Sequence, residues 1–193
     1  NPALAARIIL QASFPSAMST WIAPFSALTD KSDIVTTATP LAKTAVLNSD
    51  LNYLDMFLGL KGGCLGEVCA LALILGGIYL LIKKVIKLTI PISYILTVII
   101  FSIILGKDPI FQVLSGGLIL GAIFMATDYV TSPLTNKGRI IFGIGCGIIT
   151  MLIRVYGSLP EGVSFSILLM NILTPHIENF TKPVPFGERS NSK

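Results

Sequence analysis

Long apolar runs dominate this sequence and limit what the chain can fold into. The clearest run is 88–106, LTIPISYILTVIIFSIILG, which contains no charged side chain. A helix of about 20 such residues is long enough to cross the hydrocarbon core of a bilayer. Four further segments fit this description to varying degrees. We therefore predict five transmembrane helices, at about 64–83, 88–106, 112–127, 140–157 and 163–180.

Charged residues are scarce along the whole chain. They make up 12% of its 193 residues, about half of what a soluble domain carries. The sequence thus predicts an all-α integral membrane protein, a polytopic transmembrane helix bundle surrounded by membrane lipids. A net charge of +4 could point to nucleic acid, but the basic residues are scattered between apolar runs. No nucleic-acid partner is therefore expected.

The parts of the chain outside the five spans are interpreted separately. Residues 1–28 contain Pro15, Trp21 and Pro24, and read as the end of an earlier span plus an interfacial segment. Because the chain begins inside an apolar segment, we expect it to be a piece of a longer protein with more spans. Residues 29–63 are expected to form a loop with a short helix, and 181–193 a tail.

Lysine and arginine in the short loops indicate how the spans are oriented. Lys83, Lys84 and Lys87 lie between the first two spans, and Lys137 and Arg139 precede the fourth. Further basic residues follow the fifth span, so all three groups fall on one side if every span crosses. Cytoplasmic loops carry the excess of positive charge. The tail is therefore predicted to be cytoplasmic, and residues 29–63 extracytoplasmic.

Small and polar residues inside the spans predict contacts with protein rather than with lipid alone. The pairs Gly117–Gly121 and Gly143–Gly147 have the GxxxG spacing that lets helices approach closely. At about 100° per residue, Thr150 and Arg154 share a helix stripe with the second pair. Two interpretations of Arg154 stay open. It faces the bundle interior or a water-accessible site, or its side chain snorkels to the interface.

The remaining polar side chains carry no recognisable reaction centre. Glu67, early in its span, is a candidate for ion handling, with an ordinary carboxylate at the membrane edge as the alternative. Asn171, Thr174 and Glu178 share a helix face and are interpreted as packing contacts. No catalytic residue and no metal site are predicted. The cysteines lack metal-ligand spacing and are interpreted as small buried thiols: Cys64, Cys69 and Cys146.

A polar stretch, DIVTTATP (33–40), interrupts the apolar pattern. Thr39 precedes Pro40, and a residue before proline is pushed toward an extended conformation. Proline is favoured at the first helical position, so Thr39 is a natural N-cap for a helix that begins at Pro40. One interpretation stops at this cap. The other is that Thr39 carries a phosphate ester, which the free N–H groups of a helix start would favour.

Part of this stretch, DIVTTAT (33–39), resembles the flavinylation motif Asp-x-x-Ser/Thr-Gly-Ala-Thr of the Rnf electron-transport complex and of the Na⁺-translocating NADH:quinone reductase. Thr37 stands where that motif has glycine. Other stretches are similar, in order, to the C-terminal portion of the D subunit of the Rnf complex, and more distantly to the B subunit of the reductase. Tyr129 stands there where proline is usual. The stretches are NPALAARIILQASFP (1–15), FMATDYVTSPLTNKGR (124–139) and LPEGVSFSILLMNILTPHIENFTKP (159–183).

The resemblance implies a covalent cofactor. In this family a dedicated flavin transferase links FMN through its phosphate to the last threonine of the motif, which is Thr39 here. Asp33, Thr36, Thr37 and Ala38 complete the motif. The attachment site would then lie on the extracytoplasmic side, as the loop charges predict.

A second, noncovalent flavin, riboflavin, is a further implication of the resemblance. Arg7, Asp128 and Arg154 are candidates for the polarity of a flavin pocket, because an arginine stabilises negative charge on a reduced flavin or its phosphate. For each of the three, a structural ion pair or a snorkelling side chain is the alternative.

The resemblance also implies a function. Rnf complexes move electrons between reduced ferredoxin and NAD⁺ and couple that flow to Na⁺ or H⁺ transport. This chain would be an electron-relaying membrane subunit, without a complete active site of its own, in a bacterial or archaeal plasma membrane. Its partners would be the other Rnf subunits, A, B, C, E and G. The implied fold is half or more of an inverted-repeat bundle like that of urea transporters.

Two other functions compete with this interpretation. The first is a solute channel or transporter without flavin, since polar residues within a membrane can line a transport path. The second is a purely structural membrane subunit in which Thr39 is only a helix cap. Both predict that the chain carries no covalent flavin.

Overall fold

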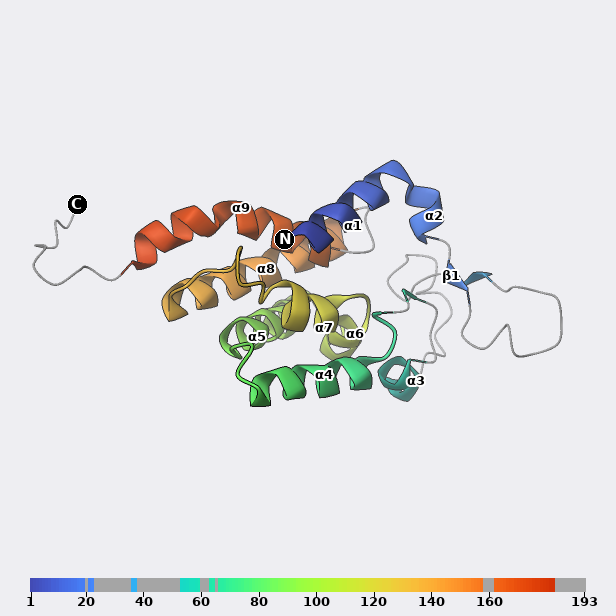
Figure 1. Ribbon diagram of the computed structural model, residues 1–193. Helices are drawn as coiled ribbons and strands as arrows, with labels where there is room; N and C mark the ends of the chain where they lie inside the picture. The colour runs from blue at the N-terminus through green and yellow to red at the C-terminus, as the bar shows by residue number, and fades with distance from the viewer. Residues whose placement is uncertain are drawn as a thin grey trace, which may run out of the picture.

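The computed structural model describes residues 1–19, 21–22, 36–37, 53–59, 63–64, 66–157 and 162–182. Within these residues the chain is a bundle of helices with one pair of two-residue strands (Figure 1). The prediction of an all-α chain is confirmed for this part of the protein, apart from the strand pair. The inverted-repeat arrangement remains a prediction.

Most of the helices lie within the apolar runs of the sequence, and turns make several helices shorter than the runs. The helices are α1 (Pro2–Ser13), α2 (Pro15–Ser19), α3 (Tyr53–Leu58), α4 (Ala70–Ile82), α5 (Thr89–Ile104), α6 (Pro109–Leu114), α7 (Leu118–Leu120), the π-helix η2 (Gly121–Met125), α8 (Asn136–Tyr156) and α9 (Val163–Thr181). The strands β1 (Trp21–Ile22) and β2 (Thr36–Thr37) pair in antiparallel fashion.

The helix lengths differ from those of the predicted spans. Within 64–83 the helix begins only at Ala70, and 112–127 is divided by a turn at 115–117. In the part of the chain that the structure describes, α8 is the one helix long and apolar enough to cross a bilayer unaided. The helices α4 and α5 are apolar but shorter. Whether each of the five segments crosses a membrane remains a prediction.

The helices α5 and α8 pack closely, and glycine makes this possible. A Cβ atom on Gly147 would lie 2.6 Å from Cβ of Thr97 and 3.2 Å from the carbonyl oxygen of Tyr94. Gly143 meets a serine of α5 in the same way. The close approach predicted for this glycine pair is therefore confirmed.

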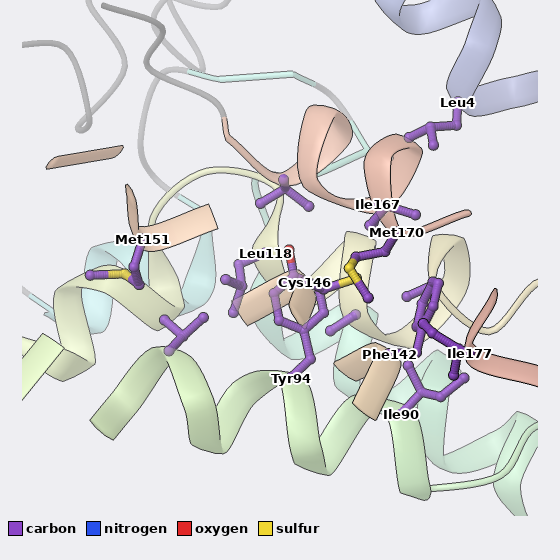
Figure 2. Packing of buried hydrophobic residues seen from close by; sticks show 14 residues of the cluster. Leu4, Ile90, Tyr94, Leu118, Phe142, Cys146, Met151, Ile167, Met170 and Ile177 are labelled. Atoms are coloured by element: carbon purple, nitrogen blue, oxygen red, sulfur yellow. The ribbon is translucent and has the colours of Figure 1, made fainter. Parts of the chain in front are cut away.

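The apolar core lies where α5, α8 and α9 meet. Figure 2 shows Phe142 and Cys146 of α8 with Tyr94 of α5 and Met170 of α9. In Figure 1, α1 and α9 form an outer layer on one side of this core, and α4 lies on the other. The prediction of a buried thiol is confirmed for Cys146, whereas the other two cysteines are half-buried and precede helix α4.

Apolar side chains also cover the outer faces of α4 and α5. A soluble monomer rarely exposes an apolar surface of this extent, so the two faces indicate contact with lipid or with another protein. The exposed side chains include Leu75, Ile78 and Ile82 of α4, and Leu96, Ile100 and Ile103 of α5.

Among the described residues, the segments that carry most of the basic side chains meet at one end of the bundle. The loop 126–135 joins them, because the hydroxyl of Tyr129 donates to the carbonyl of Val85 in the α4–α5 turn. The same loop reaches the end of α9, where Thr135 Oγ1 lies 2.7 Å from Thr181 Oγ1. Glu178 accepts from a backbone N–H of this loop, in agreement with its predicted packing role. The described members of the three basic groups, with Lys182 alone standing for the third, therefore lie at the same end, as predicted from the loops.

Candidate functional site

The strand β2 contains the two central threonines of the motif. Thr36 and Thr37 pair with Ile22 and Trp21 of β1, respectively. Thr37 stands where the motif has glycine, a residue that permits positive φ. Among the described non-glycine residues, Lys84 alone has a positive φ, so this backbone does not require glycine at Thr37. Asp33, Ala38 and Thr39 lie outside the described residues.

Helix α3 follows the motif in the sequence and packs at the end of the bundle opposite the basic segments. Its Met56 is fully buried. Gly59, at φ +91°, ends α3 against Cys69 at the start of α4. The Tyr53 hydroxyl donates to the Asp108 carboxylate, which also caps α6 by accepting from Ile110 N at 3.0 Å.

The bond between Tyr53 and Asp108 changes the acidity of both groups. Hydrogen bonding to the carboxylate raises the pKa of Tyr53, and its negative charge adds to that effect. The same hydrogen bond lowers the pKa of Asp108, and the α6 backbone N–H groups act in the same direction. Both pKa changes favour a neutral Tyr53 hydroxyl that donates to an ionised Asp108 carboxylate.

Arg154 faces the bundle interior and does not snorkel. Its Nη1 donates to the carbonyl of Gln112 at 2.6 Å and to Gln112 Oε1 at 3.1 Å. Its Nη2 donates to the carbonyl of Ser115 at 3.1 Å. The Gln112 carbonyl belongs to the last turn of α6, and the Ser115 carbonyl belongs to the turn that separates α6 from α7. Of the two interpretations of Arg154, the structure thus selects the interior one.

Arg7 of α1 forms an ion pair with Glu67, just before α4. The Glu67 side chain is 5% exposed and that of Arg7 18%. The carboxylate lies against Gly117, because a Cβ atom there would be 2.8 Å from Glu67 Oε2. Gly117 therefore makes room for a carboxylate rather than for a helix backbone, while Gly121 accommodates Val163 of α9.

The three arginine and aspartate candidates for a flavin pocket do not lie together. Arg154 donates to a carbonyl of the turn between α6 and α7, whereas Arg7 pairs with Glu67, whose carboxylate lies against Gly117 of that turn. Asp128 lies beyond the other end of η2, in the loop at the basic end, where it accepts from Thr131 Oγ1 at 3.0 Å. About 12 Å of helix, eight residues at about 1.5 Å each, separates this loop from Gly117.

A cluster of hydroxyl groups joins α5, α8 and α9 in the core. Tyr94 Oη lies 2.6 Å from Thr150 Oγ1 and 3.1 Å from Ser166 Oγ. The two smaller hydroxyls are 2.7 Å apart, and each has a backbone carbonyl of its own helix as an alternative acceptor for its single proton, that of Cys146 for Thr150 and that of Val163 for Ser166. All three side chains are buried without solvent access. Their mutual bonds satisfy groups that would otherwise be costly to bury.

Sequence reasoning found Arg154 and Thr150 but missed their partners. No role was predicted for Gln112 or Ser115. The run Ser115-Gly116-Gly117 inside an apolar segment is nevertheless a turn signal. The pairing of Arg7 with Glu67 had no local signal, because the two residues are far apart in the chain. Nothing in the local sequence distinguishes Tyr94 and Ser166 from the other residues of the apolar spans.

Comparison with known proteins places these features in a family. A model described as the NQR2, RnfD, RnfE family matches residues 1–187. The D subunit of the Na⁺-translocating ferredoxin:NAD⁺ oxidoreductase complex of Acetobacterium woodii is 54% identical, over 97% of this chain and 58% of that protein. The D subunit of the proton-translocating ferredoxin:NAD⁺ oxidoreductase complex of Clostridium ljungdahlii is 46% identical, over 98% of this chain and 61% of that protein.

A more distant relative gives the same picture. The D subunit of the ion-translocating oxidoreductase complex of Stutzerimonas stutzeri is 36% identical, over 100% of this chain and 64% of that protein. The chain therefore spans 58–64% of the length of these three relatives.

Proposed function

The chain belongs to the NQR2, RnfD, RnfE family, and we propose that it is part of a membrane subunit of an Rnf-type, redox-driven ion-translocating complex. In this proposal Thr39 carries FMN, which a flavin transferase attaches through its phosphate. The assembled complex transfers electrons between reduced ferredoxin and NAD⁺ and couples this flow to Na⁺ or H⁺ transport. The partners of this chain are the other subunits, A, B, C, E and G.

One observation carries the proposal: the motif DIVTTAT (33–39) lies in a chain that matches this family along nearly its whole length. A seven-residue pattern alone is weak support, because short motifs recur by chance. The relatives are named as D subunits of ion-translocating oxidoreductase complexes, which supports the assignment to a complex of this type. The extended backbone at Thr37 is compatible with the motif despite the missing glycine.

The arrangement of the bundle supports an extracytoplasmic position for the flavin. Three basic segments lie at one end, which we assign to the cytoplasm on the positive-inside rule. Helix α3, which follows the motif in sequence, packs on α6 and on the start of α4 at the opposite end. When bound, FMN supplies the redox chemistry, and this chain supplies the anchoring hydroxyl and the membrane scaffold.

A second flavin is not part of this proposal. Arg7 pairs with Glu67, Arg154 donates to the carbonyls of Gln112 and Ser115, and Asp128 accepts from Thr131 in the loop at the basic end. Riboflavin thus remains a prediction of the resemblance alone.

In-gel fluorescence tests the proposal. The full chain is expressed with its flavin transferase and separated under denaturing conditions, which remove noncovalent flavin. We expect a fluorescent band under ultraviolet light for the wild type and for Thr44→Ala, a nearby threonine outside the motif. Thr39→Ala should be dark. A dark wild-type band would reject covalent FMN and favour the channel or structural alternatives.

A further inference from the structure

The backbone leaves the helical conformation between α6 and α7. Helix α6 ends at Leu114, Gly116 adopts φ +63°, and α7 begins at Leu118. A helix end leaves its last carbonyls without intrahelical partners. Non-helical backbone within a membrane is tolerated only where protein or a water-filled cavity covers it. This break therefore needs donors or cations for its carbonyl oxygens.

Oxygen atoms converge on one side of the break. They are the carbonyls of Gln112 and Ser115 and the side-chain Oε1 of Gln112, all within 3.1 Å of the Arg154 guanidinium. Gln112 is 8% exposed and Ser115 is fully buried. The Ser115 hydroxyl is buried too, and has no hydrogen-bond partner among the described residues. Carbonyls at the C-terminal end of a half-helix carry partial negative charge and form cation sites in membrane transporters.

The other side of the break has the opposite charge. The Glu67 carboxylate lies against Gly117, the residue that precedes α7. Arg7 balances this carboxylate. The negative charge near α7 is therefore paired with Arg7, and the cation at the end of α6 is the Arg154 guanidinium of α8.

We propose that the end of α6 is an oxygen-lined site for a monovalent cation, and that the guanidinium of Arg154 permanently occupies it. The arginine takes the place that a mobile cation holds in a broken helix of this type. While Arg154 is in place, its guanidinium excludes a mobile cation from these oxygen atoms. Occupation of the site by Arg154 does not depend on the flavin at Thr39.

Chemical rescue tests the site. The variant Arg154→Ala removes the guanidinium and leaves the oxygen atoms. Thermal unfolding of the full chain in detergent is measured with guanidinium added at millimolar concentrations, far below those that unfold proteins. We expect the variant to melt several degrees below the wild type, and added guanidinium to restore at least half of this loss in a saturable way. Choline, which is too large for the site, should restore nothing.

The matched control is Arg139→Ala, in the same helix. Arg139 donates through Nε to a single carbonyl, that of Pro133, at the basic end. Guanidinium should give no saturable recovery in this variant or in the wild type. The absence of recovery in Arg154→Ala, or equal recovery with choline or in Arg139→Ala, would overturn the proposal.

A second pair of variants keeps the test decisive if Arg154→Ala does not fold. Arg154→Lys retains a cation, and Arg154→Met has similar length without charge. A cation site predicts a higher melting temperature for the lysine variant than for the methionine variant. A side chain that only fills space predicts the reverse, because methionine is the less costly residue in an apolar bundle.

Discussion

Tyr94 shows how one buried hydroxyl can fix the crossing of three helices. It belongs to α5, and its partners Thr150 and Ser166 belong to α8 and α9. A ring of hydroxyl groups can exchange donor and acceptor roles, so each group stays satisfied in the absence of water. Removing one member leaves the others bonded to each other and to the backbone.

The variant Tyr94→Phe should destabilise the protein by about 0.5–1.5 kcal/mol, the range for losing a hydrogen bond without burying an unpaired charge. The Thr150–Ser166 bond remains in the variant, which limits the loss. Thermal unfolding in detergent measures the change. Tyr79→Phe is the control, because that side chain is 60% exposed on the outer face of α4. Equal effects of the two variants would contradict a role for the hydroxyl cluster.

At the scale of helices, the α5–α8 contact depends on the absence of a side chain at Gly147. A Cβ atom there would approach a backbone carbonyl and Thr97 Cβ, neither of which can move without shifting α5. Gly147→Ala should therefore cost about 1–3 kcal/mol, as overpacking does. Gly145→Ala, in the same helix, should cost less, because a Cβ at that position meets the flexible end of Met170. Thermal unfolding of the two variants should rank them in this order, and the reverse order would contradict the packing described.

The docking of α3 should depend on pH through Asp108. Its pKa is lowered in the folded protein by the Tyr53 hydroxyl, so the stabilisation is complete above the unfolded value of about 3.9 and is lost as pH falls through the folded value. Tyr53→Phe removes this dependence. Hydrogen exchange of residues 53–59 should be faster in Tyr53→Phe than in the wild type at pH 6. The difference should shrink at pH 3, and a difference that is equal at both pH values would contradict the interaction.

The helices differ in how far the sequence predicts them. The apolar runs located α5, α8 and α9 to within a few residues, because charge-free segments of that length have few alternatives. The start of α4 and the division of 112–127 were harder to predict from the sequence. Glycine and serine in an apolar run are compatible with either a close helix contact or a turn. Gly117 illustrates this: it was predicted to contact a helix, and instead contacts the carboxylate of Glu67.

At the scale of the whole molecule, the bundle has two chemically different ends. Hydrogen bonds from the loop 126–135 gather the basic segments at one end, while α3 and Asp108 lie at the other. Loop charges predicted this separation, because orientation depends on a count of lysine and arginine rather than on contacts. The pair of Arg7 and Glu67 could not be predicted in the same way, since it depends on how distant segments pack.

Thiol labelling tests the orientation of the two ends. Single cysteines are introduced as Asp55→Cys or Lys87→Cys in a chain whose native cysteines are replaced by alanine. A membrane-impermeant reagent should label the first variant in intact cells, and the second only after the membrane is permeabilised. The opposite pattern would place the motif on the cytoplasmic side and remove the topological support for the proposed flavin site.

The most direct test of the proposed electron relay is mass mapping of the peptide that contains Thr39, in protein purified from its native membrane. The proposal predicts that this peptide carries the mass of FMN less one water, with fragmentation that assigns the modification to Thr39. An unmodified peptide, recovered in full yield, would contradict covalent flavin and with it the proposed role in electron transfer.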